Sequence, residues 1–393
     1  MIYVGIDVAS SKHDVCIMNS EGEIYKDIFR IENNEKSYRY LVKNIEDAKK
    51  YFDNNKVKIG LESTGVYSST LASYLISLKK YDLVYINPIL TNMFQLSESI
   101  HYTKTDAIDC QGICAYLLQK GNKTKTFALP KDEILEIKTL YREIIKLNKQ
   151  ITQSKNRLTG LIHVTFPEFF QVFQKVNGEF LLNLLINYPT PNFYIGKDSS
   201  SLLSLGSTYS KSHINKDKIE KLLFLAKNTI GTYTISDSLL IIQLSESIKL
   251  LQKHKKDIIN QLNVLVKKEC PNILTIPGVG VNIASGIIGE IGDISNFKSP
   301  ASLLAYSGLN PLVYQSGNFE AKHTRISKRG TRYLRNAIIM ATRCIVRNNN
   351  ELKRYFEKKL LEGKSYNCAI GHTSKKLVRV IYGMLRYDRK FMA

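Results

Sequence analysis

The sequence predicts an α/β amino-terminal domain, followed by a region of long helices and a mainly α carboxyl-terminal domain. Short apolar runs alternate with helical patterns up to residue 125, as in a sheet flanked by helices. Apolar residues spaced alternately by three and four then recur over 132–166 and 241–265, which is typical of coiled coils. At 393 residues the chain is also too long for one compact core. We expect domains at 1–125, 126–270 and 271–393, with an insert at 168–235.

The amino-terminal domain begins with three expected strands. Two lie within residues 1–18 and the alternating run 23–31 gives the third. A helix is predicted over 34–52, with Asn33 or Asn34 as its N-cap. A strand then ends at Glu62, and the remaining elements are a helix at 67–79, a strand at 82–86 and a helix from Pro88. This order of strands and helices is that of a ribonuclease-H-like fold, in which the first and fourth strands are neighbours.

Four carboxylates stand out in this domain. Asp7 lies within the apolar strand Val4–Ala9, where an uncompensated charge would be very costly. The expected fold brings Asp7 and Glu62 to one edge of the sheet, and Asp106 and Asp109 share one helix face. Taken singly, each is more often a solvated residue. Together they predict a site for Mg²⁺ or Mn²⁺, in which two ions about 4 Å apart could assist phosphodiester cleavage.

The sequence does not decide which helix each of the two long helical patterns pairs with. The two heptad runs can pair within one chain or between two copies of it. The insert between them contains the Ser-rich stretch 199–212, which we expect to be a mobile loop.

The carboxyl-terminal region begins with a glycine-rich turn. The pattern Ile276-Pro277-Gly278-Val279-Gly280 before a helix of small residues predicts a helix-hairpin-helix. Gly278 and Gly280 would let the backbone approach a DNA phosphate. A simple packing turn is the alternative.

Charge is concentrated in the tail. The net charge of +21 divides into +1 over residues 1–125, +5 over 126–321 and +15 over 322–393. Such a tail favours a polyanion, either nucleic acid or an anionic membrane. No apolar run reaches the roughly 18 residues of a spanning helix, and Met1 leads directly into a strand without a signal peptide. The six cysteines are scattered, and the one close pair, Cys110 and Cys114, has no second pair to complete a zinc site. We therefore expect reduced thiols, a cytoplasmic protein and no membrane partner.

Ser316 is a candidate nucleophile. It is followed by Gly317 and precedes a basic run, so that cations could offset charge on a phosphate under attack. A loop serine is usually inert unless a neighbour activates it. Five basic residues that follow it fit phosphate contact rather than base reading: Arg325, Lys328, Arg329, Arg332 and Arg335.

These motifs together resemble the DEDD transposases of the insertion-sequence 110 family, which join a RuvC-like domain to a carboxyl-terminal transposase domain. The amino-terminal motifs that carry the resemblance are Gly5-Ile6-Asp7-Val8, Leu61-Glu62-Ser63-Thr64-Gly65-Val66-Tyr67 and Lys104-Thr105-Asp106-Ala107-Ile108-Asp109. The carboxyl-terminal motifs are Ile276 to Gly280, Ala305-Tyr306-Ser307-Gly308-Leu309-Asn310-Pro311 and Ile326-Ser327-Lys328-Arg329-Gly330. Gln315 and Asn318 depart from the family pattern, which commonly has serine and glycine there.

The resemblance implies more than the residues alone. It implies that the four acids bind Mg²⁺ and that Ser316 attacks DNA and is held as a phosphoserine intermediate. It implies a structured guide RNA, called a bridge RNA, which pairs with donor and target DNA. It also implies an oligomer, a dimer or tetramer, in which the RuvC-like domain of one subunit completes a site with the serine of another.

Three other functions remain open on the sequence. A site-specific DNA invertase of similar architecture would share the chemistry without mobility. A junction-resolving nuclease would use metal-activated water and form no covalent adduct. A nucleic-acid-binding scaffold with a coiled-coil dimer would have no need of four convergent acids.

Overall fold

The computed structural model describes residues 1–62, 67–86, 88–98, 105–121, 130–209, 215–312, 315–316, 319–320, 325–348 and 351–392. The chain divides into two compact units, Met1–Pro130 and Lys131–Ala393. None of the described helices combines the length and apolarity needed to cross a bilayer.

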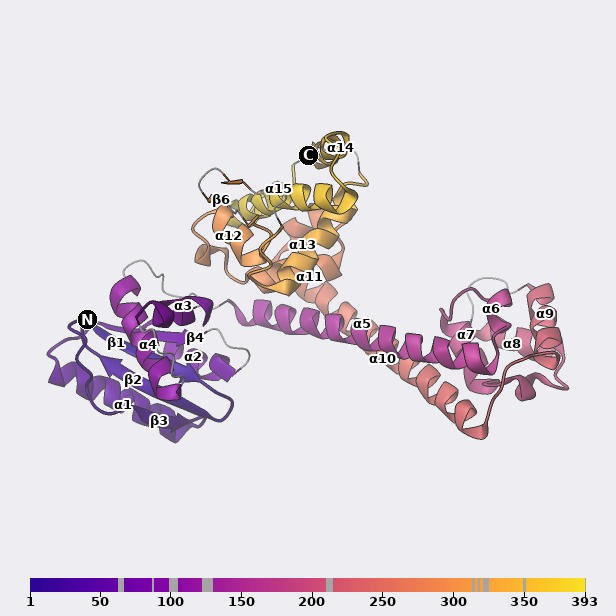
Figure 1. Cartoon of the computed structure of the whole chain (residues 1–393), viewed down its shortest axis with the longest axis horizontal. Coiled ribbons are helices and arrows are strands. Elements are labelled where there is room, and N and C mark those ends of the chain that lie inside the picture. Colours follow the sequence, from indigo (N-terminus) through magenta and orange to yellow (C-terminus); the bar gives the residue numbers. More distant parts are fainter. Residues whose placement is uncertain are drawn as a thin grey trace. The chain divides into compact units, whose positions relative to one another are not determined.

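The first unit contains a five-stranded mixed sheet of strand order β3-β2-β1-β4-β5 (Figure 1). Its strands are β1 (Ile2–Val8), β2 (Lys12–Met18), β3 (Phe29–Glu32), β4 (Val57–Glu62) and β5 (Asp82–Ile86). β1 is antiparallel to β2 and parallel to β4. The predicted ribonuclease-H-like fold is therefore confirmed, with the first and fourth strands side by side.

The helices of this unit are α1 (Glu35–Tyr51), α2 (Tyr67–Ser77), α3 (Pro88–Glu98) and α4 (Asp106–Lys120). Asn34 caps α1, because its side chain accepts a hydrogen bond from the Ser37 amide at 2.8 Å. The third strand is shorter than the predicted run 23–31. Ile24 pairs with Met18 only through an isolated bridge, so regular pairing starts at Phe29.

Two glycines allow α4 to lie directly on the sheet. Gly5 and Gly60 are register partners on β1 and β4. A Cβ atom added to Gly5 would lie 2.3 Å from the backbone oxygen of Cys110. One added to Gly60 would lie 2.8 Å from the Leu117 side chain. The absence of side chains on both strands thus sets how closely α4 approaches them.

The second unit is built on a pair of long helices, α5 (Asp132–Thr165) and α10 (Ile235–Glu269). The two helices pack against each other (Figure 1). The heptad runs therefore pair within one chain, which settles the alternative left open by the sequence. Thr234 begins α10 with a capping box to Asp237.

The insert forms a small helical domain at the far end of this pair (Figure 1). Its helices are α6 (Phe169–Val172), α7 (Glu179–Asn187), η2 (Pro191–Tyr194), α8 (Ser199–Tyr209) and α9 (Lys216–Lys227). They share a core with the end of α5 and the start of α10. The expectation of a mobile loop at 199–212 is wrong for 199–209, because Asp198 bonds the Ser201 amide and Leu202 is fully buried.

The carboxyl-terminal helices pack around the opposite ends of α5 and α10. They are η3 (Pro271–Thr275), α11 (Val281–Ile291), η4 (Ile294–Asn296), α12 (Pro300–Ser307), α13 (Arg332–Ile345), α14 (Glu351–Leu361) and α15 (Tyr366–Tyr387). One core joins them to the base of the coiled coil, where Ile137 and Ile144 of α5 are fully buried. A short hairpin of β6 (Gln315–Ser316) and β7 (Phe319–Glu320) extends from this core.

Candidate active site

The first two acids lie at the carboxyl ends of adjacent parallel strands. Ile6 and Leu61 are register partners, so the next residues, Asp7 and Glu62, are neighbours across the sheet. Each acid follows a glycine by two positions, Gly5 or Gly60. Because side chains alternate along a strand, both acids face the side of the sheet that α4 covers.

The second pair lies in the first turn of α4. Thr105 begins this helix by accepting a hydrogen bond from the Ile108 amide at 3.2 Å. Asp106 and Asp109 follow in the first turn, where carboxylates interact favourably with the helix dipole. The glycines on the sheet and the cap at Thr105 thus bring this pair toward Asp7.

The electrostatics of Asp7 reflects its burial and the charges of the other three acids. Burial raises the pKa of Asp7 most, and the charges of Glu62, Asp109 and Asp106 raise it further, to about 6. Asp14, the register partner of Asp7 on β2, adds a smaller contribution. The ionised form is therefore disfavoured until a cation compensates it.

The donor set suits a hard cation. All four groups supply carboxylate oxygens, the ligands that Mg²⁺ and Mn²⁺ prefer. Within the described ranges, no three His, Cys, Asp or Glu side chains lie close enough together to hold an ion. Three of the acids instead bond to neighbouring side chains, Glu62 to Thr91, Asp109 to Gln95 and Asp106 to Arg30.

Sequence reasoning missed Asp14 and Arg30. The guanidinium of Arg30 on β3 binds both carboxylate oxygens of Asp14, at 3.0 and 3.1 Å. The same group lies 3.5 Å from the Asp106 carboxylate. The signal in the sequence was weak, because Arg30 and Asp14 meet only through the pairing of β2 with β3.

Ser316 lies on a short hairpin. It pairs with Phe319 between β6 and β7, so the expected loop is a short strand at this position. The Ser316 side chain, and Gly317 and Asn318, lie outside the described residues. Below the hairpin, the Leu312 amide donates to the Arg325 carbonyl and the Ser327 amide to the Asn310 carbonyl, each at 2.8 Å.

A buried carboxylate anchors this stem. Glu290 of α11 is 1% exposed. It accepts hydrogen bonds from Arg142 of α5 at 2.6 and 3.0 Å and from the Thr331 hydroxyl at 2.8 Å. The Thr331 amide in turn donates to the Tyr306 carbonyl at 2.9 Å. The stem of the serine hairpin is thereby fixed to the coiled coil.

Removing Glu290 should destabilise the second unit. In Glu290→Ala, the half-buried Arg142 loses its counter-ion, and we expect the free energy of unfolding to fall by about 2–4 kcal/mol. The double variant Arg142→Met, Glu290→Leu should lose less, because a buried ion pair replaced by apolar groups is often near neutral. Denaturant unfolding of the three proteins tests this. Equal losses in the single and double variants would contradict it.

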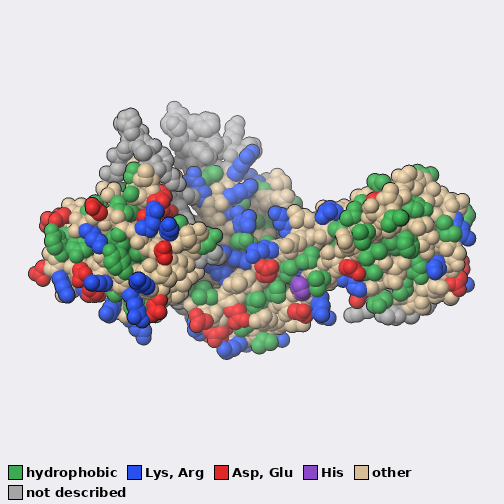
Figure 2. Space-filling view, turned by 90° about the horizontal axis from the view of Figure 1, so that it is seen from below, with side chains coloured by type: hydrophobic (Ala, Val, Ile, Leu, Met, Phe, Trp, Pro, Cys, Tyr) green, Lys and Arg blue, Asp and Glu red, His purple; other side chains and the backbone are tan. Residues whose placement is uncertain are grey.

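The predicted phosphate-contacting residues divide into two groups. Arg325, Lys328, Arg329 and Arg332 are exposed. Arg335 is half-buried, and its guanidinium donates to the carbonyls of Ser307 and Lys328, at 3.3 and 3.2 Å. Burial lowers the pKa of Arg335. Arg335 therefore stabilises the stem through hydrogen bonds to two backbone carbonyls. Figure 2 shows Lys and Arg side chains gathered in the middle of the view, over the carboxyl-terminal helices.

The structure does not confirm the predicted helix-hairpin-helix at the glycine turn. A short 3₁₀ turn, η3, precedes it in place of a full first helix. Gly278 has a φ of +77°, and a Cβ atom there would lie 3.0 Å from Cys344 of α13. Gly278 therefore lies where α13 leaves little room for a side chain. Gly280 is exposed at the N-cap of α11, with nothing within 4 Å of an added Cβ atom.

All six cysteines are unpaired. Cys110 and Cys114 are buried between α4 and the sheet, and the Cys114 thiol donates to the Cys16 carbonyl at 3.2 Å. Both residues of the closely spaced pair thus serve the packing of α4.

Two family models match the chain. The DEDD model of the IS110 family, described as "Transposase", matches residues 4–167. The model described as "Transposase IS116/IS110/IS902 family" matches residues 270–357. Together they cover more than half of the chain, in the expected order. The chain belongs to the IS110 family of transposases. It is therefore an enzyme of DNA transposition or recombination.

Relatives of this IS110-family transposase include an insertion-element protein and a gene-inverting protein. The insertion element IS110 uncharacterized 43.6 kDa protein of Streptomyces coelicolor is 22% identical over 290 residues, which are 72% of this chain and 71% of the relative. The pilin gene-inverting protein of Moraxella bovis is 31% identical over 120 residues, which are 30% of this chain and 37% of that protein.

Among solved structures, RuvC of Thermus thermophilus in complex with a Holliday junction substrate matches with a TM-score of 0.25 and 8% identity. The match covers 32% of this chain and 99% of RuvC.

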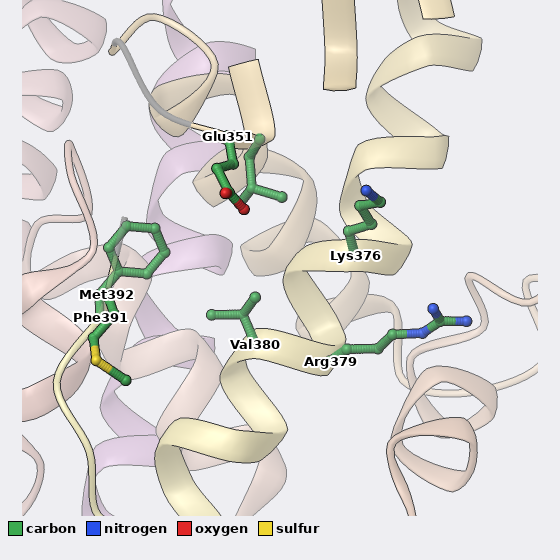
Figure 3. Close-up of a pocket in the computed structure, with 7 residues that line it drawn as sticks. Glu351, Lys376, Arg379, Val380, Phe391 and Met392 are labelled. Carbon is green, nitrogen blue, oxygen red and sulfur yellow. The ribbon is translucent and has the colours of Figure 1, made fainter. Parts of the chain in front are cut away.

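A cavity of about 280 Å³ lies in the second unit of this IS110-family chain. It lies between the start of α14, one face of α15 and the last described residues (Figure 3). Its lining includes Leu352, Val380, Phe391 and the charged residues Lys376 and Arg379. The site of chemistry predicted from the sequence does not include it.

Proposed function

We propose that this transposase cuts and rejoins DNA through Ser316, with Asp7, Glu62, Asp106 and Asp109 holding Mg²⁺ or Mn²⁺. The observation that carries this proposal is the pKa of Asp7, which burial raises most and the crowding of neighbouring carboxylates raises further, to about 6. Such crowding stores unfavourable electrostatic energy that a bound divalent cation would release. When bound, the ion stabilises negative charge on the phosphate under attack.

The chemistry is a transfer of a phosphoryl group to serine. The Ser316 oxygen forms a bond to phosphorus, its proton leaves to a base, and the bond from phosphorus to one bridging oxygen of the DNA breaks. The leaving deoxyribose oxygen then takes up a proton. Rejoining reverses these steps with a different DNA end. The exposed Arg325, Lys328 and Arg329 would contact the DNA phosphates near the serine.

The family resemblance extends this proposal to partners. We propose that a structured guide RNA selects donor and target DNA, and that the chain works as a dimer or tetramer. In that arrangement, the acids of one subunit would act with Ser316 of another. Sequencing the RNA that co-purifies with the protein tests whether it binds a structured guide RNA.

A covalent adduct tests the serine mechanism. We expect the wild-type protein to be trapped on a suicide DNA substrate. The Ser316→Ala variant should form no adduct, whereas Tyr314→Phe should retain it. An adduct that persists in Ser316→Ala would contradict the assignment. Cleavage without any adduct would favour a junction-resolving nuclease, in which water is the nucleophile.

A site-specific invertase is the second candidate. The similarity to the pilin gene-inverting protein of Moraxella bovis favours it. Both candidates use the same phosphoryl transfer, so they differ in the DNA that is joined. A recombination assay separates them, because an invertase would invert a segment between two sites without moving it to a new location.

A further inference from the structure

Two side chains of α3, Thr91 and Gln95, form hydrogen bonds to two of the proposed metal ligands. The first is Thr91, whose hydroxyl donates a hydrogen bond to Oε1 of Glu62. Thr91 is 1% exposed, so this bond is shielded from water. α3 begins at Pro88, just after β5, and Ile86 at the end of β5 is the register partner of Glu62. Thr91 is thus held one helical turn above the sheet edge that carries Glu62.

The second side chain is Gln95. Its amide nitrogen donates to Oδ1 of Asp109 at 3.2 Å and to the Ile108 carbonyl at 3.3 Å. A gap in α4 accommodates it, because a Cβ atom added to Gly112 would lie 2.2 Å from the Gln95 amide nitrogen. Any other residue at position 112 would displace Gln95 from Asp109.

Thr91 and Gln95 are four residues apart and therefore lie on one face of α3. This face links β4, which carries Glu62, to α4, which carries Asp109. Each acid has one oxygen bonded to α3, and no described residue binds the second oxygen of either. A carboxylate fixed in this way keeps its orientation and can present its other oxygen to a cation.

We propose that Thr91 and Gln95 are positioning residues, which orient Glu62 and Asp109 for metal binding. The inference rests on the proposed function, because it takes the acids to be metal ligands. It adds that α3 sets the distance between the sheet acids and the helix acids. Hydrogen-bond partners behind metal ligands typically contribute a tenfold to hundredfold effect on metal affinity.

The test measures Mn²⁺ binding to the full-length protein by calorimetric titration, without DNA. We expect Thr91→Val and Gln95→Leu each to weaken Mn²⁺ binding about tenfold. Thr91→Ser keeps the hydroxyl and should bind within about twofold of wild type. Asn92→Ala, on the exposed side of the same helix, is the matched control and should bind as wild type does. Thermal unfolding without metal should be nearly unchanged in all four variants.

The possible results distinguish the positioning role of Thr91 and Gln95 from the existence of the metal site. Unchanged Mn²⁺ affinity in Thr91→Val and Gln95→Leu, beside a loss in Glu62→Gln, would overturn the inference and leave the site intact. A lower melting temperature with unchanged affinity would also overturn it, since it would show a purely structural role. A wild-type protein that binds no Mn²⁺ would overturn the metal site and the inference together.

Discussion

In the Asp7→Asn variant, DNA strand cleavage should fall about a thousandfold or more, while the metal-free protein becomes more stable. The loss of activity follows because an amide is a poor ligand for the proposed cation. The gain in stability follows because burial and the neighbouring carboxylates disfavour the Asp7 charge. Asp7 is only half-buried, so solvent screening limits the gain to about 1 kcal/mol.

The pH dependence of this gain has a definite sign. Folding raises the pKa of Asp7 from 3.8 to about 6, so only the ionised form destabilises the folded state. The destabilisation is complete above about pH 6 and disappears near pH 4. The stability difference between Asp7→Asn and wild type should therefore be largest at pH 7–8 and shrink to nothing near pH 4.

Melting temperatures in a chelator, measured across this pH range, test the prediction. Glu35→Gln is the matched control, because Glu35 forms only an exposed pair with Arg39. Its stability should change by less than about 0.5 kcal/mol, and its cleavage activity should remain. An Asp7→Asn protein that is less stable than wild type at pH 8 would show that the Asp7 charge is already compensated.

The second large effect is expected at Gly5. In Gly5→Ala, the new methyl group would lie 2.3 Å from the backbone oxygen of Cys110, and backbone cannot rotate away. α4 must shift from the sheet, at a cost of about 3 kcal/mol. Because α4 carries Asp106 and Asp109, we expect Mn²⁺ binding and cleavage to be lost together with the packing.

Substitutions at two other glycines should cost less stability than Gly5→Ala. Gly60→Ala meets the Leu117 and Ile113 side chains at 2.8 and 2.9 Å, which can adjust, so its cost should be smaller. Gly160→Ala meets nothing within 4 Å and should be neutral or stabilising, because alanine favours a helix. Amide hydrogen exchange of the α4 segment, compared among the three variants, measures how strongly each one disturbs the packing of α4. Normal protection of α4 in Gly5→Ala would refute the close-packing argument.

Local sequence patterns sufficed for the elements of the first unit and for its strand neighbours. The apolar runs that contain Asp7 and precede Glu62, and the N-cap at Asn34, are signals contained in a few adjacent residues. The pattern of a glycine two residues before each acid was also present, at Gly5 and Gly60. Its meaning depended on α4, whose position on the sheet no local pattern specifies.

Contacts between distant segments explain what the sequence did not predict. Arg142 and Glu290 are 148 positions apart, and neither has a pattern that marks it as a partner of the other. The Ser-rich composition of 199–209 suggested a loop, but burial of Leu202 decides for a helix. Gly278 also has a packing role, because a Cβ atom added there would lie 3.0 Å from Cys344 of α13. At 199–209, tertiary packing overrides composition.

The two ends of the coiled coil have separate cores, and the consequence concerns cooperativity. No residue of α10 between 249 and 261 is buried, nor any of α5 between 152 and 157. Lys155 lies in this interval, where burial and the nearby Lys255 lower its pKa. The middle of the coil should therefore open at a lower free energy than either end. Local unfolding of the helical domain at 168–235 would leave the carboxyl-terminal core folded, because the two cores share no buried residue. The two ends of the coiled coil can therefore unfold independently.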